Sequence, residues 1–285
     1  MAEPLLAPLF ALCAATCWGA GDFTGGVATR RLDAYRSVLY SYAVGLVALV
    51  IVALARGEPI PSSADIAWGV ASGLAGMVGI VFLFRGFAAG RMGIVAPVSA
   101  VLATTIPVVF SALTRGLPGS LQLAGFVIGL AAIWLISRPE RLSGRPEGLG
   151  SAVIAGIGFA GFFIGLDQIS RGAVFWPLAA GRIASCTVMV IFAAATRRPL
   201  SIRRAPVGLL LLVGVLDVAG NLFFLLATQS GRLDSTVVLG SLYPAVTALL
   251  AWLILKEHMA RQQIAGVGAA ILAIVLITLP AAPIG

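Results

Sequence analysis

The stretch Gly90–Ser99 reads GRMGIVAPVS, and its opening glycine–arginine pair recurs 141 positions later as Gly231-Arg232. The same offset places Gln122 opposite Gln263. One register, without an insertion, holds from the second apolar segment of the chain to the last. The sequence therefore predicts two copies of one structural unit.

The composition is typical of a membrane protein. Hydrophobic residues make up 60% of the 285 residues and charged residues only 11%, and the mean hydropathy is +1.05. Soluble domains carry roughly 25% charged residues, so this chain could not cover a surface that faces water. Apolar runs near or above the length of about 18 residues that a membrane-spanning helix needs recur throughout.

Ten such runs can be delimited. They are Pro4–Ala28, Val38–Ala55, Ile66–Phe87, Ile94–Leu113, Leu121–Ser137, Leu149–Ile169, Trp176–Thr196, Val207–Thr228, Ser235–Leu255 and Ile264–Leu279. The strands of a membrane β-barrel would alternate polar and apolar residues, and these runs do not. Helices satisfy their own backbone hydrogen bonds in lipid, so we expect ten transmembrane helices.

Each copy holds five of these spans, and because five is odd the second copy must cross the membrane in the opposite direction. The expected fold is an all-α membrane protein with two inverted five-helix repeats, at residues 1–137 and 148–285, joined by a polar linker at 138–147. Inverted repeats are the architecture of alternating-access transporters, whose substrate site lies near the midplane between the halves.

The net charge of +8 would suggest a nucleic-acid partner in a soluble protein, but here the basic residues lie in short loops, where they set topology. Loops that follow odd-numbered spans hold fourteen of them: Arg30, Arg31, Arg36, Arg85, Arg91, Arg138, Arg141, Arg145, Arg197, Arg198, Arg203, Arg204, Lys256 and Arg261. Loops that follow even-numbered spans hold five: Arg56, Arg115, Arg171, Arg182 and Arg232. This bias predicts that both termini face the exterior.

Two glycine-containing stretches resemble sequence features of a known family. The first span ends in WGAGDFTGG (Trp18–Gly26), and the fourth opens with Gly90–Ser99. Together with the Lys256-Glu257 turn after the ninth span, they resemble the drug/metabolite transporter superfamily, specifically its EamA-type members, which have two five-helix repeats. The resemblance covers nearly the whole chain. In the first copy Gly116 stands opposite Glu257, so we interpret this glutamate as an interfacial cap.

The resemblance implies a carrier for small metabolites or drugs, often an exporter, in a bacterial-type cytoplasmic (inner) membrane. Many members are drawn with cytoplasmic termini, which is opposite to the orientation that the charge bias predicts. We base the expected orientation on the charge bias, because it is a property of this chain.

A carboxylate is expected at the midplane. Asp217 lies midway along its span, and Asn221 follows one helical turn later on the same face. A charge at the bilayer centre costs about 2.5–3.5 kcal/mol, so it persists where it faces a cavity or a partner. We interpret Asp217 as a residue that binds and releases a proton; the alternative is a neutral, hydrogen-bonded structural aspartate. The repeat offset places Gly76 opposite it.

Two further pairs of charged residues lie toward the ends of spans. Asp22 and Arg85 are expected at the same end of the first and third spans and could form an ion pair. Asp167 and Arg182 flank the sixth loop and could do the same on the other side. Either pair could be a structural salt bridge, or the two pairs could gate opposite ends of a central pathway.

Prolines are expected to interrupt two spans. Pro97 and Pro107 lie in the fourth span and Pro244 in the ninth, and proline frees a backbone carbonyl and kinks a helix. Tyr243 would offer a hydroxyl at the break in the ninth span; the alternative is that the prolines make simple packing kinks. Together with Trp18, Tyr243 completes the candidate residues for substrate or coupling.

Two classes of function remain open. The first is a secondary transporter of small organic solutes, driven by a proton gradient or by the solute's own gradient. Gly156–Gly161 spells G-x-G-x-x-G, but it lies inside an apolar span rather than between a strand and a helix. The second is an intramembrane lipid-acting enzyme or scramblase, which would need concentrated catalytic groups. Counter-transport of solute in proteoliposomes would distinguish the two.

Metals, enzymatic activity and cofactors are not expected. The cysteines Cys13, Cys17 and Cys186 and the single histidine, His258, have no spacing that assembles a zinc site. The expected partners are a small-molecule substrate, the lipid bilayer and protons, without nucleic acid, and the expected assembly is a monomer or a homodimer.

Overall fold

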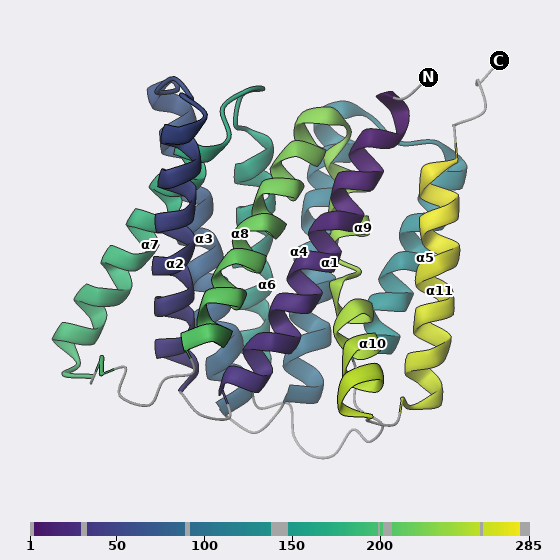
Figure 1. Cartoon of the computed structure of the whole chain (residues 1–285). Coiled ribbons are helices and arrows are strands. Elements are labelled where there is room, and N and C mark those ends of the chain that lie inside the picture. Colours follow the sequence, from purple (N-terminus) through teal and green to yellow (C-terminus); the bar gives the residue numbers. More distant parts are fainter. Residues whose placement is uncertain are drawn as a thin grey trace.

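The computed structural model describes residues 3–29, 33–88, 92–137, 148–198, 200–201, 207–256 and 259–279. Within these residues it forms a bundle of α-helices (Figure 1): α1 (Glu3–Thr29), α2 (Ala34–Ala55), α3 (Ser63–Ala88), α4 (Met92–Arg115), α5 (Ser120–Ser137), α6 (Leu149–Asp167), α7 (Phe175–Ala195), α8 (Val207–Ser230), α9 (Leu233–Gly240), α10 (Tyr243–Leu255) and α11 (Arg261–Thr278). The expected polar linker lies outside the described residues, as do Gly90, Arg91 and Glu257.

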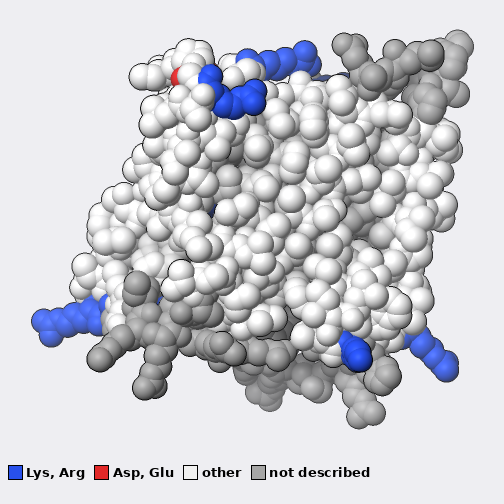
Figure 2. Space-filling model, in the orientation of Figure 1, with Lys and Arg blue, Asp and Glu red and all other residues white. Residues whose placement is uncertain are grey.

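Ten spans in the described part of the chain are long and apolar enough to cross a membrane. Their order and positions confirm the ten predicted spans. The ninth span, Leu233–Leu255, comprises two helices, α9 and α10, end to end. In the view of Figure 2, Lys and Arg lie mainly near the two ends of the molecule, with an uncharged band between them.

Helix α1 begins and α11 ends at the same end of the bundle (Figure 1). We call this end the termini face; it also carries the turns at 56–62, 116–119, 168–174 and 231–232. We call the opposite end, where α1, α3, α5, α7 and α10 terminate, the basic face, because fourteen of the nineteen Lys and Arg residues belong, in the sequence, to the connections that follow these helices or to the helix ends beside them.

The two repeats pack across each other rather than side by side. Helix α1 of the first repeat packs along α8 of the second, and α3 of the first packs along α6 of the second. The counterpart of α1 in the second repeat is α6, and the counterpart of α8 in the first repeat is α3. Replacing each helix by its counterpart therefore turns one of these pairs into the other. Two further cross-repeat pairs, α5 with α11 and α2 with α7, are each unchanged by the same exchange. The architecture therefore has the pseudo-twofold relation expected of inverted repeats.

Matched glycines show this relation at the level of single contacts. A Cβ on Gly125 of α5 would lie 2.7 Å from Cγ1 of Ile277, and a Cβ on Gly266 of α11 would lie 2.6 Å from Cγ1 of Ile136. Both contacts obey the 141-residue offset. Because lipid tails are as apolar as the helix side chains, the hydrophobic effect does not drive helices together inside a membrane. Close packing at small residues holds them together instead.

The ninth span is broken at Ser241-Leu242, directly before Pro244, which lies in the first turn of α10. This confirms the break expected there, because proline is tolerated in the first turn of a helix but not in its interior. The break predicted in the fourth span is wrong: α4 is continuous from Met92 to Arg115, although it contains Pro97 and Pro107.

Candidate functional site

A cavity lies between the two repeats at the level of Asp217, midway along α8. Its deep part, which we call the chamber, has a volume of about 170 Å³. Apolar and aromatic side chains form most of its wall. The polar side chains that line it are Asp22, Tyr42, Ser72, Arg182, Asp217, Asn221, Ser241 and Tyr243.

The chamber continues into a wider space of about 830 Å³, which we call the vestibule. The two share Trp18, Asp22, Tyr42, Asp217 and Tyr243 among their lining residues. The vestibule extends to residues near the helix ends of the basic face, including Ala28, Ser37, Ser137, Leu210 and Gln263. The vestibule therefore extends from the chamber toward the basic face.

An ion pair lies in the wall of the chamber. Nη2 of Arg182 on α7 donates a hydrogen bond to Oδ2 of Asp217 on α8. The Arg182 side chain is 9% exposed and that of Asp217 is 28% exposed. The guanidinium also lies 3.8 Å from the centroid of the Tyr42 ring on α2, within the range of a cation–π interaction. Arg182 thus links an acid of its own repeat to an aromatic ring of the other.

Small residues bring α7 close enough for this arrangement. A Cβ on Gly73 of α3 would lie 2.5 Å from Cα of Gly181, so the backbones of α3 and α7 touch at this point. The Ser185 hydroxyl donates a hydrogen bond of 2.9 Å to the carbonyl of Gly73. The close approach places Arg182, the residue after Gly181, at the chamber.

A second carboxylate, Asp22 of α1, lines both the chamber and the vestibule. Because α1 and α8 run antiparallel and in contact, Gly21 lies against Leu216 and Asp22 comes level with Asp217. Asp22 is accessible to water. Among the described residues, its side chain has no hydrogen bond or ion pair.

Trp18 lies one turn before Asp22 on the same face of α1. Its indole Nε1 donates a hydrogen bond of 3.0 Å to Oδ1 of Asn221, which is 6% exposed. The ring packs 5.8 Å from Phe163 and 5.5 Å from Phe224, measured between ring centroids. Asn221 therefore fixes the orientation of an aromatic side chain that forms part of the chamber wall.

The break in the ninth span also borders the chamber. Ser241 and Tyr243 at this break both line it, and the Tyr243 ring meets Trp18 edge-on at 6.4 Å. The Thr247 hydroxyl contacts the carbonyls of Gly19 and Tyr243 at 3.1 and 3.2 Å. Such irregular backbone is tolerated at membrane depth where it is buried in protein or lines a cavity.

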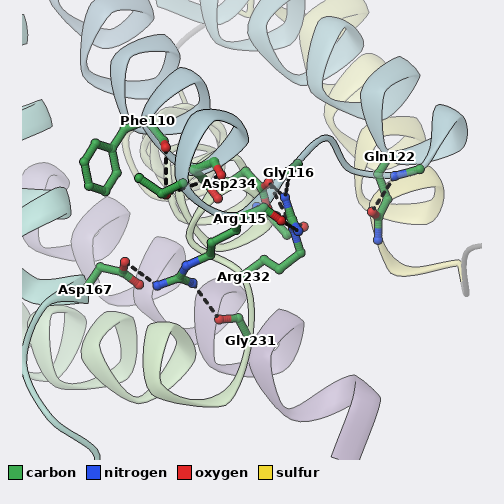
Figure 3. Close-up of polar contacts among 12 residues, drawn as sticks. Phe110, Arg115, Gly116, Gln122, Asp167, Gly231, Arg232 and Asp234 are labelled. Atoms are coloured by element: carbon green, nitrogen blue, oxygen red, sulfur yellow. Dashed lines mark hydrogen bonds and ion pairs between the residues drawn. The ribbon is translucent and has the colours of Figure 1, made fainter.

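An ion pair closes the termini face between the repeats (Figure 3). Arg115, at the end of α4, forms a 2.5 Å ion pair with Asp167, at the end of α6. The Arg115 side chain is 36% exposed, whereas that of Asp167 is only 1% exposed. Arg115 also donates to the carbonyl of Gly231, at 3.4 Å.

A second arginine completes this closure from the opposite repeat. Arg232 forms a 2.7 Å ion pair with the buried Asp234 and donates a 2.6 Å hydrogen bond to the carbonyl of Gly116 (Figure 3). It also donates to the carbonyl of Arg115. We call Arg115, Asp167, Arg232 and Asp234 the ionic closure.

The loop between α6 and α7 is held at the same face. The Glu58 carboxylate accepts backbone hydrogen bonds from Val174, Phe175 and Trp176, at 2.6–3.1 Å. It therefore satisfies free N–H groups at the start of α7 and lies where the helix dipole favours negative charge. A residue of the first repeat thus caps a helix of the second.

The pairs expected from the sequence are not formed among the described residues. Asp22 does not pair with Arg85, which instead lies over the ring of Phe82 in its own helix, at 5.8 Å. Asp167 pairs with Arg115 rather than with Arg182, which pairs with Asp217. The physical reason is helix rotation and depth. Residues near the same end of two spans meet only if both side chains point into the interface between the two helices and lie at the same depth.

Sequence reasoning missed Tyr42, Glu58 and Arg115 as members of these arrangements. Glu58 carried a usable signal, since it lies next to the second loop and the N–H groups at the start of a helix favour a carboxylate. Tyr42 carried none, because its role depends on the arginine above its ring. Among the described residues, no group of three or more His, Cys, Asp or Glu side chains could hold a metal ion.

Comparisons with known proteins agree with this architecture. The model of the EamA-like transporter family matches residues 5–138 and again residues 147–279. No curated protein matches the chain. Among the solved structures, 29 chains match. One of these, titled "Crystal structure of protein", has a TM-score of 0.81 at 16% sequence identity, over 96% of this chain and 97% of the other. That likeness shows the fold alone.

Proposed function

Because this chain belongs to the EamA-like transporter family, and is thus a membrane transporter of small molecules, we propose that it is a secondary transporter that exports small organic solutes by alternating access. The observation that carries the proposal is the chamber between the repeats. It contains charged side chains at mid-helix depth, continues to one face through the vestibule, and has the ionic closure at the other. Inverted-repeat carriers have their sites at this depth.

Alternating access requires a second state in which the termini face is open and the basic face is closed. In this state the ionic closure would separate and the vestibule would narrow. The polar contacts at the termini face are suited to this change, because the Arg115 and Arg232 side chains are 36% and 33% exposed and water can solvate their guanidinium groups when the contacts separate. The apolar contacts between α5 and α11 would remain, so these helices would support the movement of the others.

We assign the chain to a bacterial-type cytoplasmic membrane, with the basic face in the cytoplasm. The fourteen-to-five distribution of Lys and Arg supports this orientation through the positive-inside rule. The vestibule would then open to the cytoplasm, which suits loading of a solute for export.

We further propose that Asp217 couples transport to a proton gradient. Protonation would remove its charge and weaken the ion pair with Arg182. Since Arg182 also stacks on Tyr42 of the other repeat, the loss of this partner would act on the contact between the repeats. The counterpart of Asp217 in the first repeat is Gly76, so helix packing common to both repeats does not require the carboxylate.

The test is solute flux in proteoliposomes with and without an imposed pH gradient. We compare the parent, Asp217→Asn, and Asp33→Asn as a matched control. Asp33 is 47% exposed before α2 and caps that helix, and asparagine caps about as well as aspartate. Asp217→Asn should insert and fold, because the asparagine amide oxygen can still accept a hydrogen bond from Arg182, but it should lose the response to the gradient while downhill exchange continues. The Asp33→Asn control should behave like the parent.

Two outcomes would contradict this proposal. Full gradient-driven transport by Asp217→Asn would reduce Asp217 to a structural residue. A parent that moves no solute in either direction, in a screen of small metabolites and drugs, would contradict the transporter assignment itself.

A further inference from the structure

We propose that the chamber binds an organic cation, an ammonium group carried on a small apolar or aromatic body, and that Asp22 is the carboxylate that receives its charge. The inference rests on the proposed function in that the cation would be the transported solute. Its test is equilibrium binding, which does not depend on transport.

The charge balance of the site is the first reason. Among the described residues that line the chamber and the vestibule, the charged ones are Asp22, Asp217 and Arg182. Two carboxyl groups and one guanidinium leave one carboxyl group without a basic partner. An ionised group inside a membrane protein is costly unless it has a partner or water.

The unpaired carboxyl group is that of Asp22. Arg182 is already occupied, since it pairs with Asp217 and lies 3.8 Å from the Tyr42 ring centroid. Arg85 does not supply the missing charge, because its side chain lies over Phe82 and does not line either space. A ligand that brings one positive charge would complete the balance.

Aromatic side chains surround the place where the cation would lie. Trp18 and Asp22 are four residues apart on α1 and share a helix face, and both line the chamber and the vestibule. The hydrogen bond to Asn221 fixes the indole, and Tyr243 meets it edge-on. Aromatic rings attract ammonium groups, most strongly when water is excluded.

The size of the chamber limits the ligand. Its volume of about 170 Å³ is below the range of about 300–1,000 Å³ that is usual for drug-sized ligands. Phe159 and Phe162 provide an apolar wall for the body of the ligand. These features fit a compact monocation with one apolar group rather than a long or multiply charged amine.

Three probes share a benzyl group and differ in charge: benzyltrimethylammonium is positive, benzyl alcohol is neutral and phenylacetate is negative. Comparing them distinguishes the effect of charge from that of the aromatic group. A quaternary ammonium is chosen because it has no proton to lose. Binding to the purified full-length protein is measured by titration calorimetry. The parent should bind benzyltrimethylammonium at least about tenfold more tightly than benzyl alcohol, which corresponds to a difference of about 1.4 kcal/mol, and phenylacetate most weakly.

Variants at Asp22 then test whether this carboxylate causes the preference for the cation. Asp22→Asn should reduce the ratio of the two dissociation constants to about twofold or less, Asp22→Glu should keep most of it, and Asp33→Asn should match the parent. If Asp22→Asn does not fold, the ranking of the three probes on the parent and on Asp22→Glu still tests the proposal.

The inference is overturned if the parent prefers phenylacetate or benzyl alcohol, or if Asp22→Asn keeps the full preference for the cation. In that case the transporter assignment still stands on the flux assay. Conversely, binding of the cation that depends on Asp22, in a protein that moves no solute, would contradict the transporter assignment and leave the binding site in place.

Discussion

Arg115 of the first repeat and Asp167 of the second form an ion pair that joins α4 to α6 at the termini face. The carboxylate is almost completely buried, whereas the arginine is partly exposed. This pair is a direct polar link between the repeats on the side opposite the vestibule, and its separation can be measured.

Arg115→Ala should open the termini face. The reporter is Ser72→Cys in the chamber wall, in a background in which Cys13, Cys17 and Cys186 are replaced by serine. A membrane-impermeant thiol reagent added at the termini face should then react about fivefold faster, which corresponds to a shift of roughly 1 kcal/mol toward the open state. Arg56→Ala, which removes an exposed arginine at the same face, is the control.

Exchanging the two charges should restore this closure. The double variant Arg115→Asp/Asp167→Arg should label at nearly the parent's rate if the residues act through each other. Equal labelling of Arg115→Ala and the parent would exclude the pair from gating.

Arg182→Met should destabilise the protein by about 3 kcal/mol, because it leaves the carboxylate of Asp217 without its partner in a membrane interior. Arg182→Met/Asp217→Asn should recover most of this loss, since the second change removes the unpaired charge. The measurement is thermal unfolding of the purified protein in detergent, analysed as a double-mutant cycle. Additive losses would indicate that the two side chains stabilise the fold separately.

Glu58→Ala should loosen the start of α7. The free energy of unfolding should fall by about 1–2 kcal/mol, as for the loss of other helix caps, and Glu58→Gln should lose less because an amide oxygen still accepts hydrogen bonds. Hydrogen exchange should accelerate at Val174, Phe175 and Trp176, whose N–H groups are bound by Glu58. Unchanged exchange at these amides, beside a general loss of stability, would rule out a capping role.

A C-terminal reporter that fluoresces only in the cytoplasm should stay dark, because α11 ends at the termini face and the charge bias places that face outside. The same reporter inserted between α7 and α8 should be bright. Bright fluorescence at the C-terminus would reverse the proposed orientation.

The spans and their inverted arrangement were predictable, because hydropathy and an odd number of crossings per repeat determine them. Pro244 also indicated the break in the ninth span correctly. Pro97 and Pro107 show where this reasoning fails: the backbone of α4 accommodates both prolines without a break, and sequence alone does not indicate which proline breaks a helix.

The pairing of the charges was not predictable, because it depends on how each helix is rotated and how deep it lies. Asp22 and Asp217 come level only because α1 and α8 lie antiparallel in contact. Arg182 reaches Asp217 because Gly73 and Gly181 allow α3 and α7 to touch. Hydropathy gives neither the rotation nor the depth of a helix.

The break between α9 and α10 has a consequence for the resting state of the carrier. In a molecule with two identical inverted repeats, exchanging the conformations of the repeats would produce a second state of equal free energy. Here α4 is continuous while its counterpart is divided at Ser241-Leu242, so in the proposed alternating-access cycle the two states would differ in free energy even when the chamber is empty. The unloaded carrier would then have an intrinsic bias toward one side of the membrane, and for equal intrinsic affinities the apparent affinity for a solute would differ between the two sides by the same factor.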